Sequence, residues 1–166
     1  IIPTYNEKGN IDKLIPILEE EIFPQIKNHE MNILVADDNS PDGTEDEVRN
    51  LMKKWKNLEI NSGEKRGLGA AYIRGMNYAI KNMNADIMFE LDADFQHDPK
   101  KIPEFLKKID EGADMVVGNR YSNGGSIPQN WPLSRKIFSI VANLFVRTVF
   151  MKFSVCERQL FEMTKK

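Results

Sequence analysis

The sequence is poor in the residues that build disulfides and metal clusters. It has one cysteine, Cys156, and only two histidines among 166 residues. A lone cysteine excludes an internal disulfide and suits a reducing compartment, and His29 and His97 are too few and too far apart for a metal cluster. Neither a Gly-x-x-x-x-Gly-Lys motif nor a basic surplus is present, since the net charge is -2. A P-loop is therefore excluded, and we expect no nucleic-acid partner.

The chain also lacks a signal peptide, internal repeats and low-complexity segments. It opens on Ile1 and Ile2, which are too few residues for a complete strand. We therefore expect a piece of a longer protein. The remaining composition, 41% hydrophobic and 29% charged, is ordinary for a globular domain, and the length is sufficient for one domain with a core.

One long apolar stretch, residues 137–153, is interrupted by Arg147 and Lys152. It is too short and too charged to be read as a membrane span. It could be a core helix or could lie in a membrane interface, and we favour the interface.

Short apolar runs alternate with helical patterns along the chain. Strands are predicted at 33–36, 58–60, 87–91 and 115–118, and helices follow each, the last running from 133 to about 153. This alternation is typical of an α/β fold with a mostly parallel sheet. Within the helices, Asn10 is a candidate N-cap, Thr44 and Glu47 form a candidate capping box, and Gly75 indicates close packing. Residues 155–166 are polar and carry no assigned element.

Acidic residues follow the predicted strand that begins at residue 87. Asp92 and Asp94, with Gln96 two residues further on, stand where this strand should end. We expect the strand to be buried and parallel, and ligands bind at the carboxyl ends of such strands. Carboxylate and amide oxygens suit Mg²⁺ or Mn²⁺ together with a substrate diphosphate. The alternative is an ordinary surface turn, in which Asp-x-Asp is common.

A second acidic pair, Asp37 and Asp38, stands at the end of the predicted strand 33–36. Carboxylates at two strand ends would face one crevice, where a cation or a donor-rich ligand would relieve their repulsion. Alternatively, one of them caps the following turn. Arg120 and Arg135 could stabilise a departing nucleoside diphosphate or could be solvated surface residues. Glycines at 67 and 69 suggest a dinucleotide fold, but Tyr72 stands at the third glycine position and disfavours it.

Six short segments taken together resemble family 2 glycosyltransferases of the GT-A fold, and among them the dolichyl-phosphate (polyprenyl-phosphate) mannose synthases. The segments are 2–7, 35–44, 65–69, 92–97, 118–121 and 124–136. The resemblance covers residues 1–150, the catalytic domain, clipped at its amino end and incomplete at its carboxyl end. It implies a Rossmann-like three-layer fold and leaves 151–166 an unassigned polar tail, because the family's later acceptor-side motifs are absent.

The resemblance also implies an activity and a set of site residues. The enzyme would be an inverting, metal-dependent transferase that moves mannose from GDP-mannose to a dolichyl or polyprenyl phosphate. Nucleotide-sugar binding would fall to Pro3, Tyr5, Glu7, Ala36, Asp38, Asp92, Ala93, Asp94, Gln96 and Arg120. The metal, Mg²⁺ or Mn²⁺, would be held by Asp92, Asp94 and Gln96, and the catalytic residues would be Asp94, Arg120 and Arg135.

The sequence is also compatible with two other functions. The chain could be a sister enzyme that uses UDP-glucose or another sugar nucleotide, or a fragment that binds GDP without turnover. By resemblance we expect a peripheral protein at the cytoplasmic face of a membrane, the endoplasmic reticulum in a eukaryote or the plasma membrane in a prokaryote. A membrane-anchoring subunit or a C-terminal transmembrane region would be a further partner.

Overall fold

The computed structural model describes residues 1–119, 131–150 and 158–165. The chain divides into two compact units, residues 1–116 with 162–166, and residues 117–161. The elements of the first unit are β1 (Ile2–Thr4), α1 (Lys8–Pro16), the π-helical η1 (Ile17–Ile22), the 3₁₀ turn η2 (Phe23–Gln25), β2 (Ile33–Asp37), α2 (Thr44–Leu51), β3 (Leu58–Ile60), α3 (Leu68–Asn82), β4 (Ile87–Phe89), the 3₁₀ turn η3 (Pro99–Lys101) and α4 (Ile102–Asp110). β5 (Met115–Asn119), α5 (Leu133–Phe150) and β6 (Arg158–Lys165) follow.

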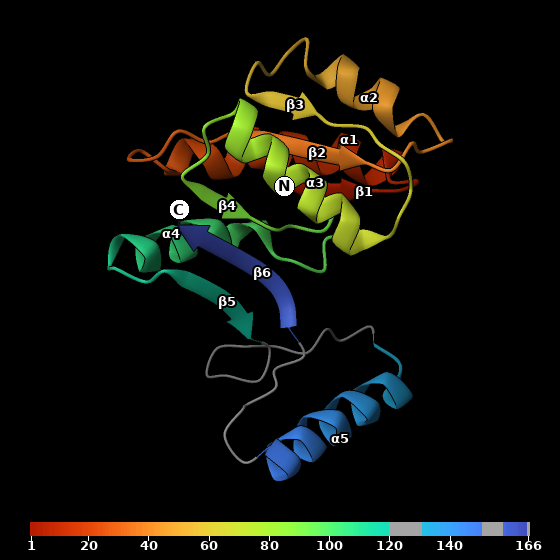
Figure 1. Cartoon of the computed structure of the whole chain (residues 1–166), viewed down its shortest axis with the longest axis vertical. Helices are drawn as coiled ribbons and strands as arrows, with labels where there is room; N and C mark the ends of the chain where they lie inside the picture. Colours follow the sequence, from red (N-terminus) through yellow and green to blue (C-terminus); the bar gives the residue numbers. More distant parts are fainter. Residues whose placement is uncertain (120–130, 151–157, 166) are drawn as a thin grey trace. The chain divides into compact units, whose positions relative to one another are not determined.

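A parallel sheet with strand order β1-β2-β3 forms the centre of the first unit (Figure 1). Ile2 is paired with Val35, and Val35 in turn with Ile60. Every residue of β2 is buried, which explains its unbroken apolar run, because a central parallel strand is covered on both faces. The predicted α/β class with a parallel sheet is confirmed.

The strand that begins at residue 87 departs from the prediction. β4 is half-buried and runs antiparallel to β6, with Ile87 opposite Lys165 and Phe89 opposite Met163. The second sheet has the order β4-β6-β5. An apolar triplet predicts a strand but does not encode its pairing direction, and here the partner comes from the segment 158–165, to which the sequence analysis assigned no element.

The first sheet nevertheless reaches the residues after β4. The backbone N–H of Ile1 donates to the carbonyl of Phe89 at 2.7 Å, and the N–H of Leu91 donates to the carbonyl of Ile1 at 3.1 Å. This alternation is the pattern of a parallel pair. It brings the acidic segment after β4 beside β1, as the sequence analysis expected.

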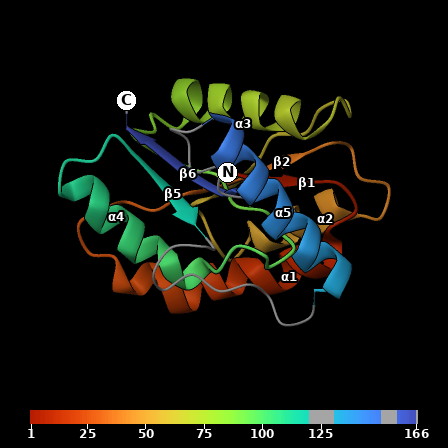
Figure 2. The same ribbon diagram turned by 90° about the horizontal axis from the view of Figure 1, so that it is seen from below.

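Helices cover both faces of the first sheet. Figure 2 shows α3 on one side of β1 and β2, and α1 and α4 on the other. The apolar residues spaced along one face of α4 are all buried: Ile102, Phe105, Leu106 and Ile109. The chain continues past Pro16 in the π-helical turn η1, so this proline ends the regular helix without ending the helical path.

Two predicted helix caps are wrong. Helix α1 begins at Lys8, with Glu7 as its N-cap residue, and Asn10 lies inside it. The hydroxyl of Thr44 does not bond the backbone N–H of Glu47; it donates to the carboxylate of Asp42, which also accepts the N–H of Thr44 at 3.0 Å. The capping box is absent because Gly43, not Thr44, is the N-cap residue, and the N–H of Glu47 donates to the carbonyl of Gly43 at 3.1 Å.

Gly75 lies where α3 packs closely on the sheet, as predicted. A Cβ atom added at Gly75 would lie 2.7 Å from Cγ2 of Ile1 and 3.4 Å from Cβ of Ala36. Gly75→Val is expected to lower the free energy of unfolding by about 1–3 kcal/mol, because overpacking forces side chains and backbone to shift. Urea unfolding of the purified variant measures this change.

Gly69→Ala is the matched control for Gly75→Val. It lies in the same helix, and no atom lies within 4 Å of the added Cβ. Alanine is the better helix former by up to about 1 kcal/mol, so this variant should be as stable as the unsubstituted chain or more so. A Gly75→Val protein with an unchanged unfolding midpoint would contradict the close-packing interpretation.

In the second unit the described helix is α5, which begins at Leu133 as predicted and is assigned to Phe150. The remaining predicted residues, 151–153, lie outside the described part of the chain. Among the described residues, no helix is both long enough and apolar enough to cross a membrane.

Candidate functional site

A cavity of about 260 Å³ opens at the carboxyl end of β1 and beyond β2. Three loops and the start of α3 surround it. Its lining residues are Pro3, Thr4, Tyr5, Glu7, Asp38, Lys65, Gly67, Leu68, Ala71, Asp92, Ala93 and Asp94. Three aspartates from two distant segments, Asp38 from one and Asp92 and Asp94 from the other, therefore line the same cavity, together with the carboxylate of Glu7. This is the edge of the sheet where α/β proteins bind ligands.

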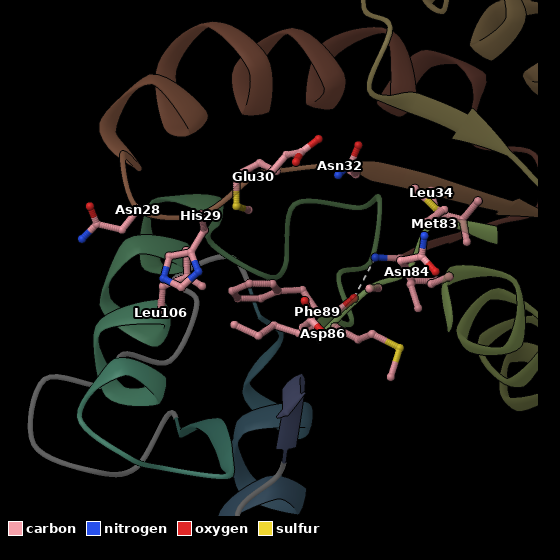
Figure 3. A pocket seen from close by; sticks show the side chains of 16 residues that line it. Asn28, His29, Glu30, Asn32, Leu34, Met83, Asn84, Asp86, Phe89 and Leu106 are labelled. Atoms are coloured by element: carbon pink, nitrogen blue, oxygen red, sulfur yellow. Dashed lines mark hydrogen bonds between the residues drawn. The ribbon is translucent and has the colours of Figure 1, made fainter. Parts of the chain in front are cut away.

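A larger cavity, about 390 Å³, lies at the opposite end of the strands (Figure 3). Leu34 near the start of β2 and Phe89 contribute apolar surface, and Asn28, His29 and Asn84 contribute polar groups. None of the predicted site residues lines it. Size alone therefore does not identify the site, and the smaller cavity carries the chemistry.

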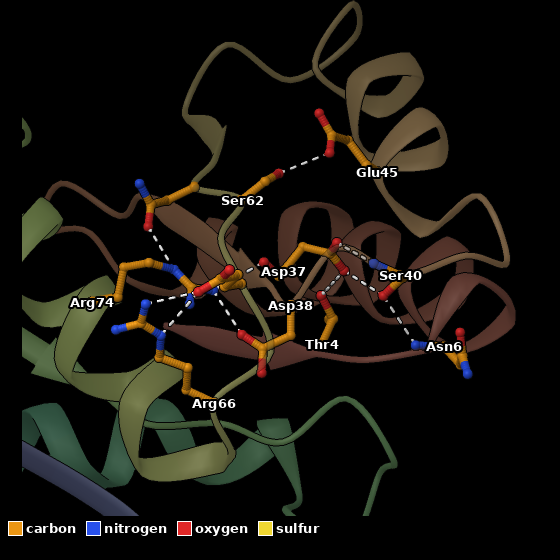
Figure 4. A network of polar contacts seen from close by, with 11 residues as sticks. Thr4, Asn6, Asp37, Asp38, Ser40, Glu45, Ser62, Arg66 and Arg74 are labelled. Carbon is orange, nitrogen blue, oxygen red and sulfur yellow. Dashed lines mark hydrogen bonds and ion pairs between the residues drawn. The ribbon is translucent and has the colours of Figure 1, made fainter.

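The neighbouring acids Asp37 and Asp38 differ in role (Figure 4). Asp37 is fully buried and accepts hydrogen bonds from Thr4 Oγ1 at 2.7 Å, Ser40 N at 2.8 Å and Ser40 Oγ at 2.6 Å. Asp37 therefore connects β1 to the turn after β2. This agrees with the alternative that one of the two acids caps that turn. Asp38 lines the cavity and is paired with Arg74 at 3.0 Å.

Hydrogen bonds join the loop after β1 to the loop after β2. Backbone N–H groups of Asn6, Glu7 and Lys8 donate to the side chains of Ser40, Thr44 and Asp42. Burial favours a raised pKa for Asp42, but the hydrogen bonds from Thr44 and Lys8 outweigh it and hold the pKa below its usual value. The carboxylate is thus charged where it accepts the N–H of the first residue of two helices, Lys8 of α1 and Thr44 of α2.

Asp92 is held by two neighbours. Its Oδ1 accepts the hydroxyl of Tyr72 at 2.9 Å, and its backbone N–H donates to Nδ1 of His97 at 3.1 Å. Burial and the adjacent Asp92 charge raise the pKa of Tyr72, so the phenol keeps its proton and donates it. His97 is buried, with its Nε2 3.8 Å from Oδ2 of Asp92. The carboxylate therefore enters the cavity in a fixed orientation.

Asp94 stands at the tip of the same loop. Its Oδ1 accepts the backbone N–H of Gln96 at 2.9 Å, and its Oδ2 accepts Gln96 Nε2 at 2.7 Å. Phe95 between them has φ +60°, a left-handed conformation that costs a non-glycine residue about 1–2 kcal/mol. This turn brings Gln96 back onto Asp94, and Gln96 itself does not line the cavity.

The donor set fits a divalent cation that is shared with a ligand. In the described ranges, no three histidine, cysteine or acidic side chains gather as a self-sufficient metal site. Mg²⁺ commonly takes only one or two carboxylates and completes its shell with water and substrate phosphates. Asp92 and Asp94, both facing the cavity, meet that requirement. The side-chain Nε2–H of Gln96 donates to Oδ2 of Asp94 and so orients that carboxylate; Gln96 itself does not line the cavity.

Two cation–aromatic pairs involve basic residues near predicted motifs. Lys65 Nζ lies 3.2 Å from the ring centroid of Tyr5, and both residues line the cavity. In the second unit, the guanidinium of Arg135 lies 4.1 Å from the ring centroid of Trp131. Lys65 thus adds a positive charge to a cavity that otherwise carries carboxylates, where it could face an anionic ligand.

Most of the predicted binding residues come together. Seven of the ten line the cavity: Pro3, Tyr5, Glu7, Asp38, Asp92, Ala93 and Asp94. Ala36 is fully buried within β2 and does not line it. Gln96 contacts Asp94 at its rim, Arg120 lies outside the described residues, and Arg135 belongs to the other unit.

Sequence reasoning missed the residues that hold the acids in place. Arg74 and Tyr72 both come from α3, and their partners lie 36 and 20 residues away along the chain. Lys65 entered the sequence analysis only as the first residue of the segment 65–69, with no role assigned to it. No local spacing connects these residues to their partners, so only the packing of α3 on the sheet identifies them.

Comparison with known proteins gives a consistent result. The sequence profile described as "Glycosyl transferase family 2" matches residues 1–162. The dolichol-phosphate mannosyltransferase of Pyrococcus furiosus is 38% identical over 139 residues, which are 84% of this chain and 37% of that protein. The polyprenol monophosphomannose synthase of Mycolicibacterium smegmatis is 37% identical over 150 residues, 89% of this chain and 53% of that protein.

A solved structure is similar as well. The crystal structure of S. aureus TarS 1-349 superposes with a TM-score of 0.56 and 26% identity, covering 77% of this chain and 37% of that one. The part of each known protein that this chain matches is therefore limited: 37% and 53% of the length of the two curated relatives, and 37% of the length of the solved structure.

Proposed function

The chain belongs to glycosyl transferase family 2, and from this premise we propose that it carries the donor site of a polyprenyl-phosphate mannosyltransferase. The donor would be GDP-mannose and the acceptor a dolichyl or polyprenyl monophosphate. The observation that carries the proposal is the convergence of Asp38, Asp92 and Asp94 on one cavity at the carboxyl ends of the strands. The names of the relatives from P. furiosus and M. smegmatis support the choice of sugar and acceptor.

Each part of the cavity suits one part of a nucleoside diphosphate sugar. Asp38, which lines the cavity, would accept a hydrogen bond from a base N–H or a ribose hydroxyl. Asp92 and Asp94 would hold Mg²⁺ or Mn²⁺. That ion would supply positive charge to the diphosphate of the departing GDP. Tyr5 and Lys65 offer an aromatic face and a cation at the same rim.

The acceptor's own chemistry simplifies the reaction. A phosphate monoester has a second pKa of about 6, so near neutral pH it is largely a dianion and arrives as a ready nucleophile. No strong general base is then required of the chain. The protein's contribution reduces to holding the donor in line with the acceptor and to stabilising charge on the leaving group.

Calorimetric binding of GDP-mannose, GDP and UDP-glucose, each with Mn²⁺ and with EDTA, tests the donor assignment. Metal-enhanced binding of the two guanosine ligands, with weak binding of UDP-glucose, is expected. Preference for UDP-glucose would replace the donor and keep the family. Transfer of labelled mannose to a polyprenyl phosphate then separates an active transferase from a fragment that binds GDP without turnover.

We further propose that the protein works on the cytoplasmic face of a membrane, where a polyprenyl phosphate resides. The single cysteine suits the reducing side. Helix α5 supports a surface contact, because it combines Arg135 and Lys136 with many exposed apolar side chains. These are Leu133, Ile137, Phe138, Ile140, Val141, Leu144 and Phe145.

Replacing Phe138 and Phe145 of α5 with serine is expected to weaken binding to anionic lipid vesicles by about tenfold or more. Fully burying each phenylalanine is worth about 1.5–3 kcal/mol. Sedimentation with vesicles measures the partition. Ile73→Ser, a change at an exposed apolar residue of α3, is the matched control and should leave the partition unchanged. Equal losses in both proteins would argue against α5 as the contact.

A further inference from the structure

The side chain of Asp38 is only 7% exposed, yet it lines the cavity. A buried carboxylate is costly unless a cation and hydrogen bonds compensate it. Arg74 supplies both, with Nη2 3.0 Å from Oδ1 of Asp38. The pair therefore keeps a charged acceptor at a position where an unpaired one would be unfavourable.

Arg74 is itself firmly seated. Its Nη2 also donates to the backbone carbonyl of Asp37 at 2.9 Å, and its Nε donates to Oδ1 of Asn61 at 3.1 Å (Figure 4). The backbone at Gly63 packs directly on the guanidinium, since a Cβ there would lie 2.9 Å from Nε and 3.0 Å from Cζ. These three hydrogen bonds and the contact with Gly63 fix the orientation of the Arg74 guanidinium.

The two oxygens of Asp38 are used differently. Arg74 occupies Oδ1, and within the part of the chain that the structure describes no hydrogen bond is donated to Oδ2. Arg74 is not among the residues that line the cavity. Any effect of Arg74 on a ligand in the cavity must therefore pass through Asp38.

We propose that Arg74 is a positioning residue for nucleoside recognition, which fixes Asp38 with Oδ1 bound and Oδ2 available to an N–H or O–H donor of a nucleoside diphosphate. This inference rests on the proposed function, because it needs a nucleotide in the cavity. It adds a residue of α3 that does not touch the ligand. The role would be lost with Arg74 even though every residue of the cavity lining is retained.

The test is calorimetric binding of GDP in EDTA, which isolates the nucleoside from any metal contribution. Arg74→Gln is expected to weaken binding by roughly tenfold or more, the size of a lost hydrogen bond to a charged group. Asp38→Asn should have a similar effect. In the double variant the losses should not multiply, because Arg74 acts only through Asp38. Arg74→Lys should restore part of the affinity.

Controls separate positioning from folding. Arg49→Gln breaks an ion pair with Glu45 on the exposed face of α2 and should leave GDP binding unchanged. Gly63→Ala keeps the charge but crowds the guanidinium, so it should weaken GDP binding even if Arg74→Gln is too unstable to measure. Repeating the titration with 2′-deoxy-GDP distinguishes a base contact from a ribose contact.

The outcomes divide clearly. If the unsubstituted chain binds GDP, and Arg74→Gln and Gly63→Ala bind it equally well, the positioning role is wrong and the donor site stands. Multiplied losses in the double variant would also overturn it, because they would show independent effects. If the unsubstituted chain binds no guanosine nucleotide, the proposed function itself fails.

Discussion

Asp94→Ala is expected to remove the metal-dependent part of GDP binding, with a loss of about 100-fold or more in the presence of Mn²⁺. Asp94 faces the cavity with both oxygens oriented by Gln96, and Asp92 alone would be left to hold the ion. Because one carboxylate and water bind Mg²⁺ or Mn²⁺ only weakly, the diphosphate would lose its counter-charge. Titration with GDP in Mn²⁺ and in EDTA measures the effect.

Binding of GDP in EDTA is the internal control for Asp94→Ala and should change little, because Asp38 is untouched. Asp98→Ala is the external control. Asp98 lies four residues further on, accepts the N–H of Lys100 at 3.0 Å and does not line the cavity. If Asp94→Ala kept the full stimulation by Mn²⁺, the metal assignment would have to be abandoned.

Asp37→Ala is expected to lower the free energy of unfolding by about 3–5 kcal/mol, the largest stability effect that we expect in the chain. The carboxylate is fully buried and accepts three hydrogen bonds, one from Thr4 and two from Ser40. Alanine would leave those donors without an acceptor inside the protein. Urea unfolding followed by circular dichroism measures the loss.

Asp46→Ala is the reference for Asp37→Ala, because it removes an exposed acid from the first turn of α2 and should change stability by no more than about 0.5 kcal/mol. A loss below about 1 kcal/mol at Asp37 would mean that water replaces the lost acceptor.

The sequence predicted the elements whose patterns are strong and local. The apolar runs that became β2 and β3 lie where expected, because a buried strand is recognisable from a short run of apolar residues. Seven of the ten residues that the resemblance predicts to bind the nucleotide sugar line one cavity. Motif residues near strand ends were identifiable because parallel strands share an edge.

The rest depended on contacts between distant segments. The direction of β4 is set by β6, about 75 residues away in the pairing of Phe89 with Met163. The hydroxyl oxygen of Thr44 accepts the N–H of Glu7, 37 residues away, and Gly43 takes the N-cap position that the sequence analysis gave to Thr44. Arg74 reaches Asp38 only because α3 packs closely at Gly75. These contacts depend on tertiary packing between distant segments, so short-range sequence patterns do not predict them.

The hydrogen bonds between the loop after β1 and the loop after β2 have a consequence for protein engineering. Backbone N–H groups of Asn6, Glu7 and Lys8 donate to side chains of the second loop, so we expect either loop to lose these hydrogen bonds and its shape when it is transplanted alone. A chimera designed to alter the ligand selectivity of the cavity should therefore exchange residues 5–8 and 37–44 as a pair. Exchanging only one of the two loops would break the hydrogen bonds between them, and this loss would mask any change in selectivity.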